Sequence, residues 1–286
     1  MKVVHVAFTL FQRDENSFYP MALAAAYVSI RQRTQSILNI HIIVDKSVSI
    51  VNKQKIKDSI SSCDVLHFYN AEDLGDVHEL SLLLDTRFSP AIVWRVWLDV
   101  YLKHLGRCIL MDCDFICAAD IDELWDLDLG PCLISAPLRT VPHSKVLHQW
   151  LDVPPGKYFR MCCSVLNLDK MRQHQDFVFK RRDFLLEAAS VASTASGGLK
   201  QAGLLEQSVF NKFFSNLCFP LPIPVIPISR ISGHPRETEW KEQLVRNKSL
   251  LFDIKGWTSP SPYAALFWSA LFNTAWRGEA IAQFEI

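Results

Sequence analysis

The chain has 286 residues and a formal net charge of zero, which excludes a nucleic-acid partner held by bulk electrostatics. Hydrophobic residues make up 49% of the chain and charged residues 21%, as in an ordinary globular enzyme with a large core. No apolar run has the length of a transmembrane helix or the form of a signal peptide, so we expect a cytoplasmic protein. The eight cysteines lack zinc-site spacing and lie mostly in apolar runs, which predicts buried free thiols in a reducing compartment.

Strand and helix patterns alternate along the first half of the chain. Short apolar runs predict strands, and longer stretches with apolar residues at helical spacing predict helices. We expect strands at residues 3–8, 40–44, 65–69 and 108–111, and helices at residues 21–31, 52–61 and 90–105. This β-α-β-α order predicts an α/β fold with a mostly parallel, Rossmann-like sheet and right-handed crossovers.

The second half ends in an aromatic tail. Further strands are expected at residues 132–136 and 165–168, and helices at residues 177–192 and 204–214. Residues 263–286 are predicted to form a small helical appendage to a main domain at residues 1–262, with Trp268, Phe272 and Trp276 in one stripe. The stripe either packs onto the main domain or contacts a membrane peripherally. Arg277 is nearly alone as a basic residue there, which favours packing.

Asp112-Cys113-Asp114 is the most informative motif. It follows the expected strand at residues 108–111, and the period of two in a strand places both carboxylates on one side. The carboxyl ends of parallel strands open onto the ligand crevice of an α/β sheet. Two hard oxygen ligands at such a place suit Mg²⁺ or Mn²⁺ bound together with a diphosphate, and structural carboxylates at a strand end are the alternative.

The stretch from Phe88 to Pro131 resembles glycosyltransferase family 8, which includes glycogenin and bacterial lipopolysaccharide glucosyl- and galactosyltransferases. It reads FSPAIVWRVWLDVYLKHLGRCILMDCDFICAADIDELWDLDLGP. Members of that family commonly show F-S-x-A, an aromatic-Arg pair, Y-L-D-x-D and D-I-x-E-L-W-D-x-D-L in this order. The resemblance implies a GT-A type nucleotide-diphospho-sugar transferase fold, a Mn²⁺ or Mg²⁺ cofactor and a UDP-sugar donor.

The resemblance also implies how the donor diphosphate is held. Asp112 and Asp114 would be metal ligands, and together with Cys113 they would form part of the donor site. Arg95 falls where the family places an arginine that contacts the donor, and a guanidinium can bridge sugar hydroxyls and phosphate by forked hydrogen bonds. A surface arginine on a helix is the alternative, but Arg95 lies between Trp94 and Trp97, which favours a buried partner.

Base-binding positions are implied on and after the first strand. Ala7 lies on that strand, and the segment Asp14-Glu15-Asn16 occupies the slot of the family's D-D-N motif. A carboxylate at Asp14 can accept a hydrogen bond from the uracil imide. The alternative for Asp14 and Asn16 is a solvated turn with an N-capping side chain.

Arg160-Met161-Cys162 departs from the family pattern. The segment from Lys157 to Arg172 resembles the family's Y-F-N-A/S-G-V-L-L-I-N-L-x-x-W-R, but its N-A-G core is replaced. In relatives that core lines the donor-sugar pocket. Arg160 and Cys162 are therefore expected to contact the donor and to change the shape and charge of the pocket, which leaves the donor sugar open and allows for reduced activity.

Glu206-Gln207 corresponds to the family's D-Q pair and is the implied catalytic pair, with Asn211 matching a trailing asparagine. The acidic residue would hold sugar hydroxyls, and the glutamine would lie near the anomeric carbon. An amide is a poor nucleophile, which favours a same-face replacement over a double displacement. The alternative is an ordinary polar helix face.

The C-terminal section matches the family's H-x-x-G-x-x-K-P-W motif only in part. The third metal ligand is either His234 or Asp253, and Lys255 is implied to bind the diphosphate, with Lys241 as the alternative lysine.

The resemblance as a whole implies a retaining, metal-dependent transferase that moves a hexose, glucose or galactose, from a UDP-sugar to a saccharide of bacterial lipopolysaccharide or another surface glycan. The protein would act in the cytoplasm, with a peripheral contact to the inner membrane as an option. A relative with weak or no activity that binds a nucleotide sugar or a partner is the alternative. A D-x-D phosphatase is disfavoured because Ile116 stands where that motif has threonine.

Overall fold

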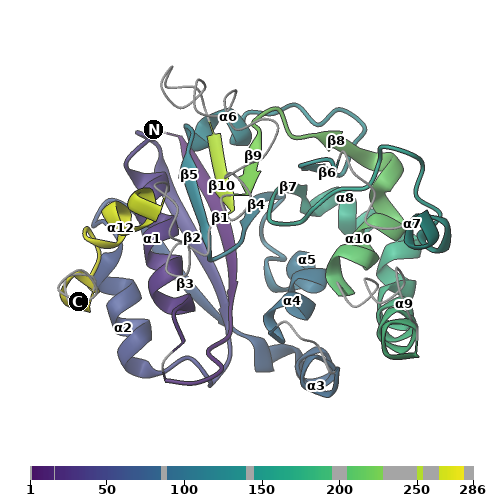
Figure 1. Cartoon of the computed structure of the whole chain (residues 1–286), viewed down its shortest axis with the longest axis horizontal. Helices are drawn as coiled ribbons and strands as arrows, with labels where there is room; N and C mark the ends of the chain where they lie inside the picture. The colour runs from purple at the N-terminus through teal and green to yellow at the C-terminus, as the bar shows by residue number, and fades with distance from the viewer. Residues whose placement is uncertain are drawn as a thin grey trace.

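A seven-stranded sheet forms the centre of the computed structural model, which describes residues 2–15, 17–84, 89–139, 145–194, 205–227, 250–253 and 264–279 (Figure 1). The strand order is β3-β2-β1-β4-β7-β6-β8. The strands are β1 (Val3–Leu10), β2 (Ile37–Val44), β3 (Val65–Asn70), β4 (Arg107–Met111), β6 (Ile134–Ala136), β7 (Cys163–Asn167) and β8 (Cys218–Pro220).

The expected mostly parallel sheet is confirmed. Strands β3, β2, β1 and β4 run parallel, whereas β7 pairs antiparallel with both β4 and β6. Strands β1 and β2 are buried along nearly their whole length, as parallel strands covered on both faces are. The antiparallel β7 was not expected, because the local pattern of a buried strand does not encode its direction.

Helices cover both faces of the sheet. On one face, Val6 and Phe8 of β1 join a core that includes residues of α1 (Tyr19–Arg31), α2 (Ile50–Ser59) and α6 (Ile121–Trp125). On the other face, Ala7 joins a second core. That core includes residues of α3 (Gly75–Leu83), α4 (Ala91–Trp94), α5 (Leu98–Tyr101), α7 (Lys145–Leu151), α8 (Leu168–Gln173), α9 (Gln175–Thr194) and α10 (Leu205–Phe214).

Helix α1 is buried on almost all sides. Its Ala-rich sequence allows close approach, and Pro20 stands in its first turn, where a missing N–H costs nothing. The helix packs between the sheet, β5 (Phe115–Ala118) and α12 (Ala264–Leu271). A helix that is apolar all round belongs in the interior, which is where this one lies.

A second, three-stranded sheet lies beside the D-x-D motif. Its order is β5-β10-β9, with β9 at Val225–Pro227 and β10 at Leu250–Asp253. In the antiparallel register of β5 and β10, Asp253 pairs with Phe115, the residue after Asp114. The C-terminal section therefore returns to the loop that carries the two aspartates.

Two expected helices differ from the structure. The single helix expected at residues 90–105 is α4, a 3₁₀ turn η2 (Arg95–Trp97) and α5, and the change of helix type begins at Arg95. The helix expected at residues 263–286 is interrupted, because α12 ends at Leu271 and a turn at residues 272–276 precedes further helical residues at 277–279.

The aromatic tail packs against the main body of the protein. Phe267, Leu271 and Trp276 are buried in the same core as α1, and Trp268 and Phe272 pack partly buried against it. The stripe therefore contacts the domain. In the described parts of the chain no helix combines the length and the apolarity that crossing a membrane requires.

Candidate functional site

The D-x-D motif emerges at the carboxyl edge of the sheet. Strands β1 and β4 pair in parallel, with Ala7 opposite Leu110, so the residues that follow both strands leave the sheet at the same edge. Cys113 is buried and its Sγ lies 3.4 Å from the carbonyl oxygen of Thr9, whereas Asp112 and Asp114 are half-buried. This alternation follows the period of two that the sequence predicted.

Arg95 links the motif to the start of α10. Its Nη1 lies 2.6 Å from Oδ1 of Asp112 and 3.8 Å from Oε1 of Glu206, and its Nε donates a hydrogen bond to Oγ1 of Thr9 at 3.0 Å. The residue is only 8% exposed. Burial opposes its charge, but Asp112 and Glu206 outweigh burial and raise the pKa of Arg95 above its ordinary value. A permanent cation therefore stands between two carboxylates.

Glu206 is a buried acid in the first turn of α10. Burial raises the pKa of Glu206 to about 7, Arg95 opposes the shift and Asp112 adds to it. Near neutral pH this carboxyl group can therefore either accept or donate a hydrogen bond. Raised carboxyl pKa values of this kind gather at functional sites, which marks Glu206 as a candidate on grounds other than sequence.

Gln207 and Asn211 fix the segment that leads into Arg160. The Gln207 amide donates to the hydroxyl of Tyr158 at 2.8 Å. Asn211 accepts from the N–H of Phe159 and donates to its carbonyl oxygen, both at 2.9 Å, and it also donates to the carbonyl oxygen of Gln207. Buried amides with satisfied partners hold a backbone rigidly. The side chain of Gln207 is thus oriented by Tyr158 and the backbone before Arg160 by Asn211.

Tyr19 and Thr9 belong to the site but carried no signal in the sequence. Tyr19 is 37% exposed, yet its partial burial, followed by the charges of Asp114 and its neighbours in the motif, raises the pKa of Tyr19 to about 12. Thr9 receives the Arg95 hydrogen bond described above. A threonine near the end of a strand and a tyrosine at the start of a helix are common anywhere, so only their neighbours in space identify them.

The other expected site residues are placed as follows. Ala7 is fully buried inside β1, before the strand ends at Leu10. Asp14 is exposed in the loop after β1, where its carbonyl oxygen accepts a hydrogen bond from Gln12. Cys162 is buried and its carbonyl oxygen accepts from the N–H of Asp112 at 2.9 Å. The backbone N–H of Arg160 donates a hydrogen bond to the carbonyl oxygen of Pro137 at 3.0 Å. Asn16, His234, Lys241 and Lys255 lie outside the described residues.

The donor set fits a hard divalent cation. Asp112 and Asp114 offer carboxylate oxygens directly after β4, and oxygen ligands are those that Mg²⁺ and Mn²⁺ take. Asp112 and Glu206 flank the guanidinium of Arg95. The eight cysteines are free thiols, and burial raises the pKa of Cys113, which disfavours it as a metal-binding thiolate. Among the described residues the site therefore combines these carboxylates with the buried guanidinium of Arg95, a combination suited to a metal and a phosphorylated ligand.

Comparison with known proteins gives the family. Residues 10–224 match the model of glycosyl transferase family 8. General stress protein A of Bacillus subtilis (strain 168) is 22% identical over 178 residues, which are 61% of this chain and 60% of the relative. A putative glycosyltransferase of Haemophilus influenzae is 24% identical over 170 residues, 59% of this chain and 50% of the relative. The matched region thus spans only 60% and 50% of these two curated relatives.

Solved structures agree in fold. The apo structure of the bifunctional glycosyltransferase WbbM superposes with a TM-score of 0.73 at 18% identity, covering 98% of this chain and 51% of that one. The galactosyltransferase LgtC, in complex with donor and acceptor sugar analogues, gives 0.69 at 16% identity and covers 96% of this chain and 100% of LgtC. Because the family match spans most of the sequence and the fold agrees, the chain belongs to glycosyl transferase family 8 and has a GT-A type fold.

Proposed function

We propose that this protein transfers a hexose from a UDP-sugar to a saccharide acceptor, with retention of configuration and with the help of Mn²⁺ or Mg²⁺. The observation that carries the proposal is the contact of Arg95 with both Asp112 and Glu206 at the carboxyl edge of the sheet, in a chain of family 8. Such an edge is where α/β folds bind nucleotides.

Asp112 and Asp114 would hold the metal ion, which when bound supplies positive charge to the departing diphosphate. The Arg95 guanidinium is already oriented by Thr9 and Asp112. Its remaining donors are suited to a phosphate or sugar oxygen of the donor. A buried, preorganised cation of this kind stabilises charge that develops on a leaving group better than a mobile one, because no reorganisation is needed during the reaction.

Glu206 and Gln207 would bind the transferred sugar. Glu206, with its pKa of about 7, can hold sugar hydroxyls in either protonation state. Gln207 is oriented by the Tyr158 hydroxyl and has no acid–base role. Because an amide is a poor nucleophile, we propose that the acceptor enters on the face from which UDP leaves.

The nature of the sugars rests on relatives. LgtC is a galactosyltransferase solved with donor and acceptor sugar analogues, in line with galactose as the transferred hexose. Glucose as the alternative hexose, and a surface glycan such as lipopolysaccharide as the acceptor, rest on the family resemblance of the sequence. The eight free thiols suit action in the reducing cytoplasm.

The test is release of UDP from a panel of UDP-sugars in the presence of Mn²⁺, together with calorimetric binding of UDP. We expect Asp114→Ala to abolish metal-dependent UDP binding while the fold is kept, because a half-buried carboxylate in a loop adds little to the core. Asp58→Ala, which removes an exposed carboxylate from α2, is the matched control and should bind normally. Unchanged, metal-dependent UDP affinity of Asp114→Ala would refute the assignment.

The alternative is a relative that binds donor without turning it over. It is favoured by Met161 and Cys162, which are both buried where relatives have a small-residue core. Metal-dependent UDP binding without UDP release from any sugar of the panel would support this alternative.

A further inference from the structure

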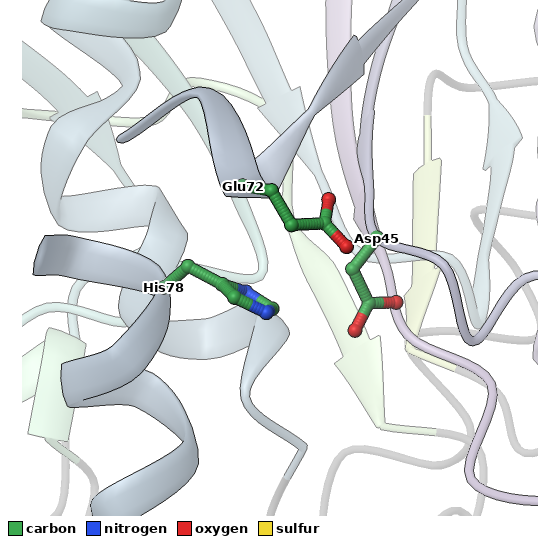
Figure 2. Close-up of side chains that lie close together, drawn as sticks. All are labelled: Asp45, Glu72 and His78. Carbon is green, nitrogen blue, oxygen red and sulfur yellow. The ribbon is translucent and has the colours of Figure 1, made fainter. Parts of the chain in front are cut away.

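Three side chains that the transfer reaction does not use converge at the carboxyl ends of β2 and β3. Asp45 directly follows β2, Glu72 lies in the 3₁₀ turn η1 (Ala71–Leu74) after β3, and His78 lies in α3. One ligand atom of each lies within 4.8 Å of the other two. Figure 2 shows the two carboxylates and the imidazole pointing toward one another from these separate elements.

His78 is buried but lacks a polar partner on one side. The residue is 8% exposed, and its Nδ1 has no hydrogen bond to any of the described residues. Its ring lies against Trp94, with ring centroids 6.0 Å apart, and its carbonyl oxygen accepts a hydrogen bond from Ser81. A buried nitrogen without a partner is costly unless a ligand completes it. The imidazole therefore indicates a ligand that the described residues do not supply.

The two carboxylates are oriented but not neutralised. Oδ1 of Asp45 accepts hydrogen bonds from the N–H and the hydroxyl of Ser47, and Oε1 of Glu72 accepts from the N–H of Lys46 at 3.0 Å. Within the described ranges neither carboxylate forms an ion pair with a lysine or arginine. Two acidic groups thus face one buried imidazole, and a cation bound between them would offset their negative charge.

We propose that Asp45, Glu72 and His78 bind a divalent transition-metal ion of the zinc class. Three atoms no more than 4.8 Å apart share a point within about 2.8 Å of each (4.8 Å divided by the square root of three), so small shifts would reach the bond lengths of about 2.0–2.2 Å that zinc forms with nitrogen and oxygen. The imidazole favours such an ion over Mg²⁺ or Ca²⁺, which take oxygen ligands. Water would complete the shell.

The bound ion would stabilise the loops beside the donor site. It would tie the ends of β2 and β3 to α3. Hydrogen bonds connect Asp45 through Ser47 to the loop after β1. The Ser47 hydroxyl accepts a hydrogen bond from the N–H of Gln12 at 3.1 Å, and the side chain of Gln12 donates to the carbonyl oxygen of Asp14 at 3.1 Å. The ion would thus act as a structural brace for the proposed base-binding loop, separate from the D-x-D metal.

The experiment measures how much Zn²⁺ the full chain binds. Every protein tested also carries Asp114→Ala, so that the D-x-D metal does not contribute. Protein freed of metal with a chelator is titrated with Zn²⁺ in calorimetry, and Co²⁺ absorption reports nitrogen and oxygen coordination. We expect one equivalent of Zn²⁺. His78→Leu should lose it, and His148→Leu should keep it. His148 is the matched control, since it also has a buried, unpartnered ring nitrogen but stacks on Tyr158 away from this cluster.

A second variant guards against misfolding of His78→Leu. Glu72 is exposed, and a glutamine there can still accept the hydrogen bond from Lys46. Glu72→Gln should lower the Zn²⁺ affinity at least about ten-fold, as even changes around metal ligands do. Glu79→Gln, an exposed change on the same helix, should have no effect. No bound equivalent in the starting protein, or equal Zn²⁺ affinity with and without Glu72 and His78, would overturn the proposal.

Discussion

Glu206→Gln should stabilise the metal-free protein at alkaline pH while impairing transfer. The Glu206 side chain is 11% exposed, and burial raises its pKa from 4.5 to about 7. An acid whose pKa is higher in the folded than in the unfolded protein makes its full contribution to stability below the unfolded pKa. That contribution is lost as the pH rises through the folded pKa. From these pKa values, ionisation of Glu206 costs less than about 1 kcal/mol at pH 5 and about 3 kcal/mol at pH 9.

A neutral glutamine avoids this cost. Urea denaturation of wild type and Glu206→Gln should therefore give nearly equal free energies of unfolding at pH 5, and an advantage of about 3 kcal/mol for the variant at pH 9. Glu187→Gln, the same change at an exposed position of α9, should show no pH-dependent difference. A pH-independent difference for Glu206→Gln would refute the reasoning, because it would mean that Arg95 fully compensates the buried charge.

Three further predictions concern other parts of the chain. Burial, followed by neighbouring imidazoles, lowers the pKa of His41 to about 3, so stability should fall as the pH drops below 6.5, by about 1.4 kcal/mol per pH unit. His41→Asn should flatten this slope in urea denaturation between pH 6.5 and 4.5, and an unchanged slope would contradict the assignment. Arg160→Asn combined with Cys162→Gly should change which UDP-sugar is hydrolysed or raise the rate of UDP release; the same donor preference and rate would remove both residues from the sugar site. Lys255→Ala should lower kcat roughly 100-fold or more and weaken UDP-sugar binding, with little effect on the acceptor KM. Lys241→Ala is the control, and a defect in Lys241→Ala alone would mean that the C-terminal alignment is wrong.

Local sequence patterns were enough to predict much of the fold. The apolar runs that become β1, β2, β3 and β4 were identified correctly, with bounds that differ by a few residues at their ends. Their success has a physical cause: parallel strands buried on both faces are continuous apolar runs, and helices between them keep a period of 3.6. The interruption of the helix at Arg95 was missed, because its backbone changes type within a continuous apolar sequence.

The D-x-D motif could also be read from the sequence, since its two carboxylates are set by strand alternation alone. The contacts of Arg95 with Asp112 and Glu206 could not, because they join three segments that come together only when η2, the end of β4 and α10 pack. The third metal ligand stays a prediction: β10 places Asp253 opposite Phe115, while His234 lies outside the described residues.

The sequence by itself therefore determined the α/β class, the family resemblance and the position of the acidic motif, because each depends on neighbours along the chain. The tertiary structure decided which carboxyl group is buried enough to hold its proton near pH 7, as at Glu206. It also brought Asp45, Glu72 and His78 together from a strand end, a turn and a helix. Burial and the meeting of distant side chains depend on how whole elements pack, and no local spacing in the sequence encodes them.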